Sequence, residues 1–161
     1  MLFRSLVVAK RWKSEMPAIE AALAAAAAES GVVIQYATDI DRWFSVSVPP
    51  KRRRSRAFRR VGRLSVHLLD PACWTVYKLS RYLEGDQEDL RAVLRRERVP
   101  WRRVATLAGE ALRTSPRSTQ LILFRRQVEH FLRVEGHAIW GARFDAIHAV
   151  KIGRASCRER V

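Results

Sequence analysis

The pattern of hydrophobic and polar positions in the first third of the chain predicts short strands around one helix. Residues 6–10 (LVVAK) form an apolar run typical of a buried strand, with β-branched valines inside it. Residues 18–30 are rich in alanine, follow a Ser-Glu-Met-Pro start and precede Gly31, which predicts a helix that ends at this glycine. Residues 32–36 favour a strand, and residues 43–48 alternate with a period of two, as a half-buried strand does.

The pattern then changes from strand to helix. Residues 61–69 alternate between apolar and polar positions, and Asp70 followed by Pro71 is a typical helix start. We expect this helix to end near residues 84–85. Three further helices are predicted from apolar residues at helical spacing, which are Leu90, Val93 and Leu94, then Val104, Leu107, Ala108, Ala111 and Leu112, then Leu121, Phe124, Val128, Phe131 and Leu132. This order predicts an α+β fold, with a small sheet and an Ala-rich helix followed by a C-terminal helical bundle.

Composition agrees with a folded protein and adds a strong positive charge. The 161 residues suffice for one domain with a real core, and 48% of them are hydrophobic. The formal net charge of +15 comes almost entirely from arginine, which fits both a GC-rich coding sequence and a surface that favours polyanions. No apolar run is long enough to cross a bilayer, and two cysteines do not make a disulfide framework. We therefore expect a soluble, cytoplasmic protein with no membrane partner.

Both ends of the chain resemble translated sequencing adapter. The run KIGRASCRERV at residues 151–161 and the run LFRS within residues 1–5 match the two adapter ends, in the orientations that a sequencing read gives them. We expect these two segments not to belong to the native protein and the gene to continue beyond both of them. Without them, Cys73 is the only cysteine left.

Several candidate motifs have an ordinary structural interpretation. Asp39 and Asp41 form a D-x-D pair of the kind that grips Mg²⁺ and a triphosphate, but their context favours a solvated turn. The basic run at residues 51–60 is dense enough to contact phosphates, yet we expect a solvated, mobile loop, because only Phe58 is available for stacking. No metal is assigned to Cys73 or to the histidines, which lack ligand spacing and are His67, His130, His137 and His148.

The segment at residues 68–94 carries the most specific pattern. Lys78 lies among apolar neighbours on a predicted helix, so its ammonium group must reach solvent or meet an anion. Arg81 is three residues further on, on the same helical face, so the two cations can converge on one phosphate group. Asp86 and Asp89 have a structural alternative, because Asp at the N-cap with an acid three residues later approximates a capping box.

This segment resembles the signature of a bacterial family of nucleotidyltransferase-fold proteins related to the AbiEii-type toxins of toxin–antitoxin systems. The resemblance covers most of residues 16–96, includes the Trp43-Phe44 pair, and is carried by six positions, which are Asp70, Pro71, Lys78, Arg81, Asp86 and Asp89. It implies an incomplete nucleotidyltransferase-like domain at residues 6–96 and a helical region at residues 97–150. It also implies Mg²⁺ and a nucleoside triphosphate as cofactors, with Lys78 and Arg81 binding the nucleotide phosphates and Asp86 and Asp89 in catalytic positions.

One departure from the family pattern changes the expected activity. The metal-binding carboxylate pair of the family precedes the Ala-rich helix, and nothing between Leu6 and Lys13 supplies it. Asp39 and Asp41 come after that helix and are not assigned the role. The resemblance thus implies nucleotidyl transfer to an unknown acceptor, such as a nucleic acid or tRNA, and an antitoxin partner, but we expect this chain to be inactive as written. The alternative is a non-enzymatic basic α+β module that binds nucleic acid or a protein partner.

Overall fold

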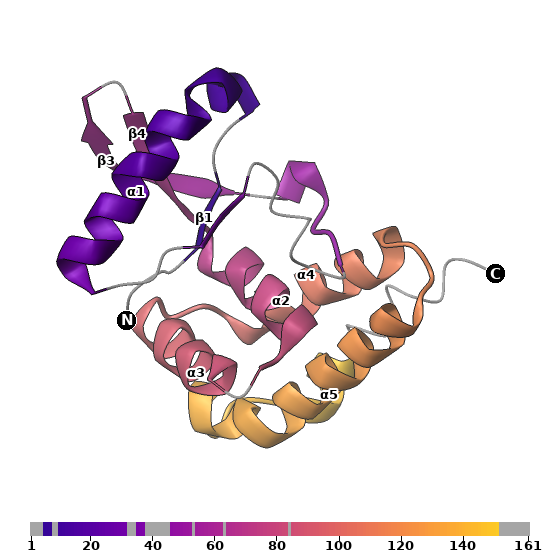
Figure 1. Cartoon of the computed structure of the whole chain (residues 1–161). Helices are drawn as coiled ribbons and strands as arrows, with labels where there is room; N and C mark the ends of the chain where they lie inside the picture. The colour runs from indigo at the N-terminus through magenta and orange to yellow at the C-terminus, as the bar shows by residue number, and fades with distance from the viewer. Residues whose placement is uncertain are drawn as a thin grey trace. The chain divides into compact units, whose positions relative to one another are not determined.

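The protein has an α+β fold, as predicted, in two compact units that divide between Trp43 and Phe44. The computed structural model describes residues 5–7, 10–31, 35–37, 46–52, 54–62, 64–83 and 85–151 (Figure 1). This division groups residues by their contacts, whereas the ranges 6–96 and 97–150 follow the family resemblance and stay a prediction. The adapter-like residues 1–4 and 152–161 lie outside the described residues.

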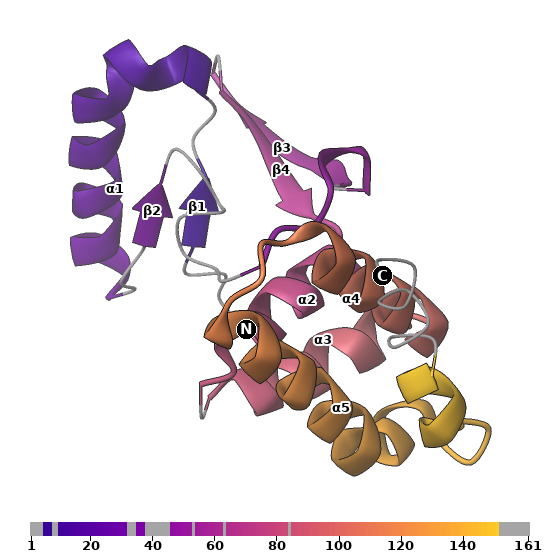
Figure 2. The ribbon, with the colours of Figure 1, turned by 90° about the vertical axis from the view of Figure 1, so that its right-hand side faces the viewer.

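The first unit is a strand–helix–strand motif. It contains β1 (Ser5–Val7), the 3-10 helix η1 (Lys10–Glu15), α1 (Met16–Ser30) and β2 (Gln35–Ala37). The two strands pair in parallel, with Leu6 opposite Tyr36, and α1 is the crossover that parallel strands require (Figure 2). Gly31 ends α1 in the left-handed region at a φ of 66°, where glycine carries no steric cost. The strands and helix predicted here are therefore confirmed where the structure describes them, and residues 8–9 and 32–34 of the predicted strands lie outside the described residues.

The second unit begins with a β-hairpin that corrects one prediction. After the 3-10 helix η3 (Pro50–Arg52), β3 (Ser55–Val61) pairs antiparallel with β4 (Leu64–Leu69), with a bulge between Ala57 and Arg59. Most of the basic run expected to be a mobile loop is thus a strand. Its backbone groups are bonded to β4, while its arginine side chains point into solvent and need no core.

The segment before the hairpin corrects a second prediction. Residues 46–48 were expected to belong to a strand, but none of them pairs in a sheet, and residues 43–45 lie outside the described residues. Val46 and Val48 are buried, and the backbone N–H of Ser47 donates to the Ser115 hydroxyl at 3.0 Å. The alternation therefore predicts burial correctly, but the Ser47 N–H is bonded by Ser115, the residue after α4 (Trp101–Thr114), and not by a neighbouring strand.

Four helices form the core of the second unit. They are α2 (Pro71–Arg81), α3 (Asp86–Arg96), α4 (Trp101–Thr114) and α5 (Thr119–Trp140), and residues 146–151 are helical as well. Helix α2 lies at the centre, against α3, α4 and α5 (Figure 1). Its start is the one predicted, because the Asp70 carboxylate accepts from the backbone N–H groups of Ala72 at 3.0 Å and Cys73 at 3.2 Å. Among the described residues, no helix is long and apolar enough to cross a membrane.

Aromatic side chains fasten the chain after α5 to the bundle. Trp140 and Phe144 stack with ring centroids 5.2 Å apart, and Trp101 meets Phe144 edge to face at 5.7 Å. The indole N–H of Trp140 donates to the carbonyl of Val99 at 2.7 Å. Phe144 lies directly over Gly136 of α5, where a Cβ atom would overlap its ring. The absence of a side chain at this glycine is therefore what allows the close packing.

Tyr82, which ends α2, has a buried hydroxyl whose effect on stability can be measured. Its ring lies edge to face with Phe131 at 6.5 Å, while its hydroxyl is buried and has no hydrogen-bond partner among the described residues. Burial raises the pKa of this phenol, and the Glu135 carboxylate adds to the effect. We expect Tyr82→Phe to raise the free energy of unfolding by about 1 kcal/mol, because it removes an unsatisfied group and keeps the ring. Urea unfolding measures this, and a clear loss of stability would show that the hydroxyl has a partner in solution.

Candidate functional site

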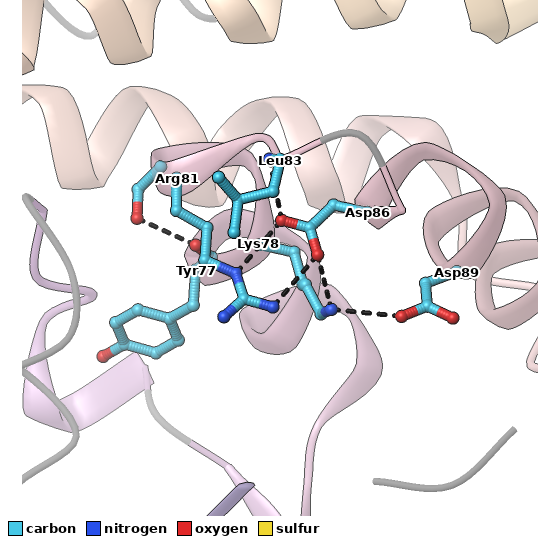
Figure 3. Close-up of polar contacts among 7 residues, drawn as sticks. Tyr77, Lys78, Arg81, Leu83, Asp86 and Asp89 are labelled. Atoms are coloured by element: carbon cyan, nitrogen blue, oxygen red, sulfur yellow. Dashed lines mark hydrogen bonds and ion pairs between the residues drawn. The ribbon is translucent and has the colours of Figure 1, made fainter. Parts of the chain in front are cut away.

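The four residues predicted to form a site lie together at the α2–α3 turn (Figure 3). Lys78 and Arg81 are in the last turn of α2, and Asp86 and Asp89 are in the first turn of α3. Their three-residue spacings put each pair on one helical face, and the short turn brings the two faces toward each other. We call these four residues the turn cluster.

Asp86 is the centre of the turn cluster and is only 3% exposed. Its Oδ1 accepts from Lys78 Nζ at 2.6 Å and from a terminal guanidinium nitrogen of Arg81 at 3.0 Å. Its Oδ2 accepts from Arg81 Nε at 3.0 Å and from the backbone N–H of Leu83 at 3.0 Å. Each carboxylate oxygen thus has two donors, and the contact with Arg81 is bidentate, the strongest geometry for this pair.

The charges around Asp86 decide its ionisation. Burial by itself raises the pKa of this carboxyl, but the hydrogen bonds from Arg81, Lys78 and the Leu83 N–H outweigh burial and hold the pKa below its usual value. The carboxylate is therefore ionised at neutral pH, and the buried charge is balanced by two cations.

Lys78 is held between two acids and an aromatic ring. Besides Asp86, its ammonium group donates to Asp89 Oδ2 at 3.1 Å and lies 5.4 Å from the centroid of the Trp74 ring. The Lys78 side chain is 15% exposed, whereas that of Asp89 is 41% exposed. Of the two alternatives expected for this lysine, reaching solvent or meeting an anion, the structure shows the second, and the anion belongs to the protein itself.

The structural alternative for Asp86 and Asp89, a capping box at the start of α3, is wrong. The N-cap is Gly85, with no side-chain hydrogen bond, and Asp86 is the first helical residue. Instead of bonding the N–H groups of its own helix, the Asp86 carboxylate turns back toward the cations of α2, and Asp89 bonds Lys78. Two cations in a half-buried turn are stronger partners for a carboxylate than neutral amides, which explains the difference.

The turn cluster does not fit Mg²⁺. This ion prefers several free oxygen ligands in octahedral geometry, but both oxygens of Asp86 already have two donors, and Asp89 stands on the exposed rim. No group of three or more His, Cys, Asp or Glu residues that could hold a metal occurs in the part of the chain that the structure describes. Asp39 and Asp41, the other acidic pair of the sequence, lie outside that part.

The turn cluster does leave hydrogen-bond donors for an anion. Lys78 uses two of its three N–H groups on carboxylates, and Arg81 uses Nε and one terminal nitrogen. The Arg81 side chain is 33% exposed, and its second terminal nitrogen has no hydrogen-bond partner among the described residues. The arrangement can present a fixed cationic edge to a phosphate, although two carboxylates offset much of the charge.

A second ion pair, in which the carboxylate is buried and the arginine is 41% exposed, was not predicted from the sequence. Arg91 of α3 donates to both carboxylate oxygens of Glu135 on α5, at 2.5 and 2.6 Å, and these bonds hold the pKa of Glu135 below its usual value. The signal was present, because Glu135 follows Phe131 and Leu132 at helical spacing on the apolar face of α5. An acid on such a face predicts a cationic partner on a neighbouring helix.

Comparison of the chain with family models, with curated proteins and with solved structures finds no match.

Proposed function

We propose that the turn cluster binds the phosphates of a nucleotide in a nucleotidyltransferase-fold protein. One observation supports this above the others: Lys78, Arg81, Asp86 and Asp89, which carry the family resemblance, converge from two helices within hydrogen-bond distance of one another. Binding sites are usually built from side chains that are separated in the sequence and brought together by the fold. The nucleoside triphosphate would be the donor of a nucleotidyl group, and the acceptor is unknown.

In this proposal the two cations contact phosphate and the acids position them. Asp86 fixes Lys78 and Arg81 through charge-assisted bonds, so little side-chain freedom is lost when a phosphate binds. Nucleotidyl transfer also needs carboxylates that hold Mg²⁺, and the turn cluster does not provide them. We therefore propose nucleotide binding for this chain and assign no catalytic step to Asp86 or Asp89.

Nucleotide titration of Lys78→Ala tests the proposal. We expect this change to weaken binding of a nucleoside triphosphate about tenfold, the effect of losing one charge-assisted hydrogen bond of about 1.5 kcal/mol. Lys51→Ala is the matched control, because Lys51 is an exposed lysine of the same unit outside the turn cluster. Isothermal titration with each of the four triphosphates, with and without Mg²⁺, measures the affinities.

The fold of Lys78→Ala should survive, because Arg81 still pairs with Asp86 through two hydrogen bonds. Circular dichroism checks this before titration. If Lys78→Ala and Lys51→Ala bind every triphosphate with the same affinity, the turn cluster has no nucleotide role and its ion pairs serve the α2–α3 turn alone.

Binding of nucleic acid without catalysis is the second candidate function. It is favoured by the hairpin, where β3 carries three exposed arginines on its two faces, namely Arg56, Arg59 and Arg60. Of these, Arg56 is paired with Glu97 at 3.3 Å. Such a strand can follow a phosphate backbone without reading its sequence. This candidate predicts affinity for long strands of any sequence, whereas the turn cluster predicts affinity for single nucleotides.

A further inference from the structure

We propose that a pocket between η3 and α4 binds a phosphate monoester that carries a neighbouring hydrogen-bond donor. The pocket has a volume of about 230 Å³ and lies within the second unit, and it is lined by Arg52, Arg54, Arg102, Arg103, Thr106, Leu107 and Glu110. We call it the arginine pocket. Arg103 also pairs with Asp70, the residue that caps the start of α2, at 2.8 Å.

The arginine pocket is separate from the turn cluster. Asp70 stands at the first turn of α2 and Lys78 and Arg81 at its last turn. An α-helix of this length is about 16 Å long, which is too far for one phosphate group to reach both places. The pocket is therefore a second anion site, and it does not depend on the nucleotide proposal.

Two of the four arginines in the pocket have no anionic partner in the part of the chain that the structure describes. Arg52 pairs with Glu110 at 2.8 Å and Arg103 with Asp70 at 2.8 Å. Among the described residues, Arg54 and Arg102 make no ion pair, and Arg102 is held over the ring of Trp101 with 4.5 Å between its guanidinium carbon and the ring centroid. Guanidinium groups gathered in one hollow repel each other, and a doubly charged phosphate relieves this repulsion through bidentate hydrogen bonds.

Glu110 indicates what the rest of the ligand carries. Its side chain is 9% exposed, and its Oε1 accepts from Arg52. Its Oε2 is buried and has no hydrogen-bond partner among the described residues. A buried carboxylate oxygen without a donor is costly, so a hydroxyl or amino group beside the phosphate would stabilise the complex.

The size of the pocket limits the ligand further. At about 230 Å³ it is smaller than the pockets of about 300–1,000 Å³ that enclose whole drug-sized ligands. It fits one phosphate and the few atoms attached to it. A sugar phosphate has this chemistry, either as a free molecule or as the terminal phosphate of a nucleic-acid strand.

Calorimetric titration with ribose 5-phosphate at low ionic strength tests the proposal, at pH 8 where the phosphate is a dianion because its second pKa is about 6. The double variant Arg54→Ala/Arg102→Ala should weaken binding about tenfold for each arginine. The control is Arg117→Ala/Arg126→Ala, which removes the same charge from exposed arginines outside the pocket and should leave the affinity unchanged. An equal loss in both variants, or no binding to the unmodified protein, overturns the proposal.

Methyl phosphate tests the role of Glu110, because it presents the dianion without a neighbouring hydroxyl. We expect the unmodified protein to bind ribose 5-phosphate more tightly than methyl phosphate. The Glu110→Gln variant should lose this preference, because its amide offers a donor where the carboxylate oxygen accepted. A preference that survives in Glu110→Gln overturns the role of Glu110.

A short oligonucleotide with and without a 5′-phosphate distinguishes a free sugar phosphate from the end of a nucleic-acid strand. Binding that requires the phosphate indicates a strand end, and equal binding of both oligonucleotides overturns the monoester assignment.

Discussion

Replacing Asp86 with alanine is expected to lower the free energy of unfolding by about 3 kcal/mol, at the lower end of the effect of breaking a buried ion pair. The change removes four hydrogen bonds and leaves Lys78 and Arg81 without a shared partner in the turn. The cations are not fully buried, since their side chains are 15% and 33% exposed, and solvent recovers part of the loss. Urea unfolding followed by circular dichroism measures the change.

Asp89→Ala is the matched control for Asp86→Ala. It removes a carboxylate from the same cluster and the same helix turn, but this side chain is 41% exposed and, within the described ranges, bonds Lys78 alone. An exposed pair of this kind contributes less than about 1 kcal/mol. If both substitutions cost the same, the stability of the turn does not depend on the buried carboxylate.

The acid dependence of stability gives a second readout for Asp86. Because the folded-state pKa of Asp86 is lowered, its contribution is fully present above the unfolded-state pKa of about 3.9 and is lost as the pH falls through the folded-state pKa. We expect the difference in stability between the unmodified protein and Asp86→Asn to narrow as the pH falls below about 4. Glu135 also has a lowered pKa and makes stability depend on pH in the same direction. Its effect is the same in both proteins and cancels when their free energies of unfolding are subtracted. A difference that does not change with pH would contradict the lowered pKa.

Gly136→Ala is expected to lower the free energy of unfolding by about 2 kcal/mol, the usual cost of overpacking a core. Helix propensity alone predicts a gain in the free energy of unfolding, because alanine stabilises a helix interior by about 1 kcal/mol relative to glycine. Packing outweighs propensity here, since the new Cβ would overlap the Phe144 ring, which is stacked on Trp140 and held edge to face by Trp101. Moving the ring out of the way disturbs both contacts.

Gly85→Ala is the control for Gly136→Ala. It makes the same chemical change at a site where a Cβ meets nothing within 4 Å, so no overpacking is expected. The double variant Gly136→Ala/Phe144→Leu isolates the contact, because a smaller side chain should recover part of the loss through a favourable coupling energy. Thermal and urea unfolding measure both. Stabilisation by Gly136→Ala alone would mean that Phe144 moves away at little cost.

The start of α2 shows what local sequence determines. Asp70 and Pro71 were predicted as cap and first turn from two adjacent residues, because the carboxylate bonds N–H groups only two and three positions away. The start of α3 looked equally local, yet its acids bond the cations of the preceding helix. Sequence spacing put all four residues of the turn cluster on the right faces, but it contained no information on which partner each carboxylate would choose.

The longer-range features could not be predicted for a related reason. The basic run at residues 51–60 has the composition of a loop, and its residues 55–60 form a strand because β4 supplies a hydrogen-bonding edge. The Arg91–Glu135 pair joins positions 44 residues apart, and Gly136 is needed only because Phe144 folds back over it. Of these contacts, only the Arg91–Glu135 pair had a local signal, the acid on the apolar face of α5, and that signal did not identify its partner.

The sequence by itself determined the α+β class, the order of the helices, the cap of α2 and the convergence of Lys78 with Arg81, because helical periodicity and capping act within a few residues. Only the tertiary structure decided that Asp86 is a buried ion-pair partner with no free oxygen for a metal. It alone also collected four arginines and a half-satisfied Glu110 into one pocket. Ion pairing and burial depend on which segments lie side by side, and that is a property of the whole fold.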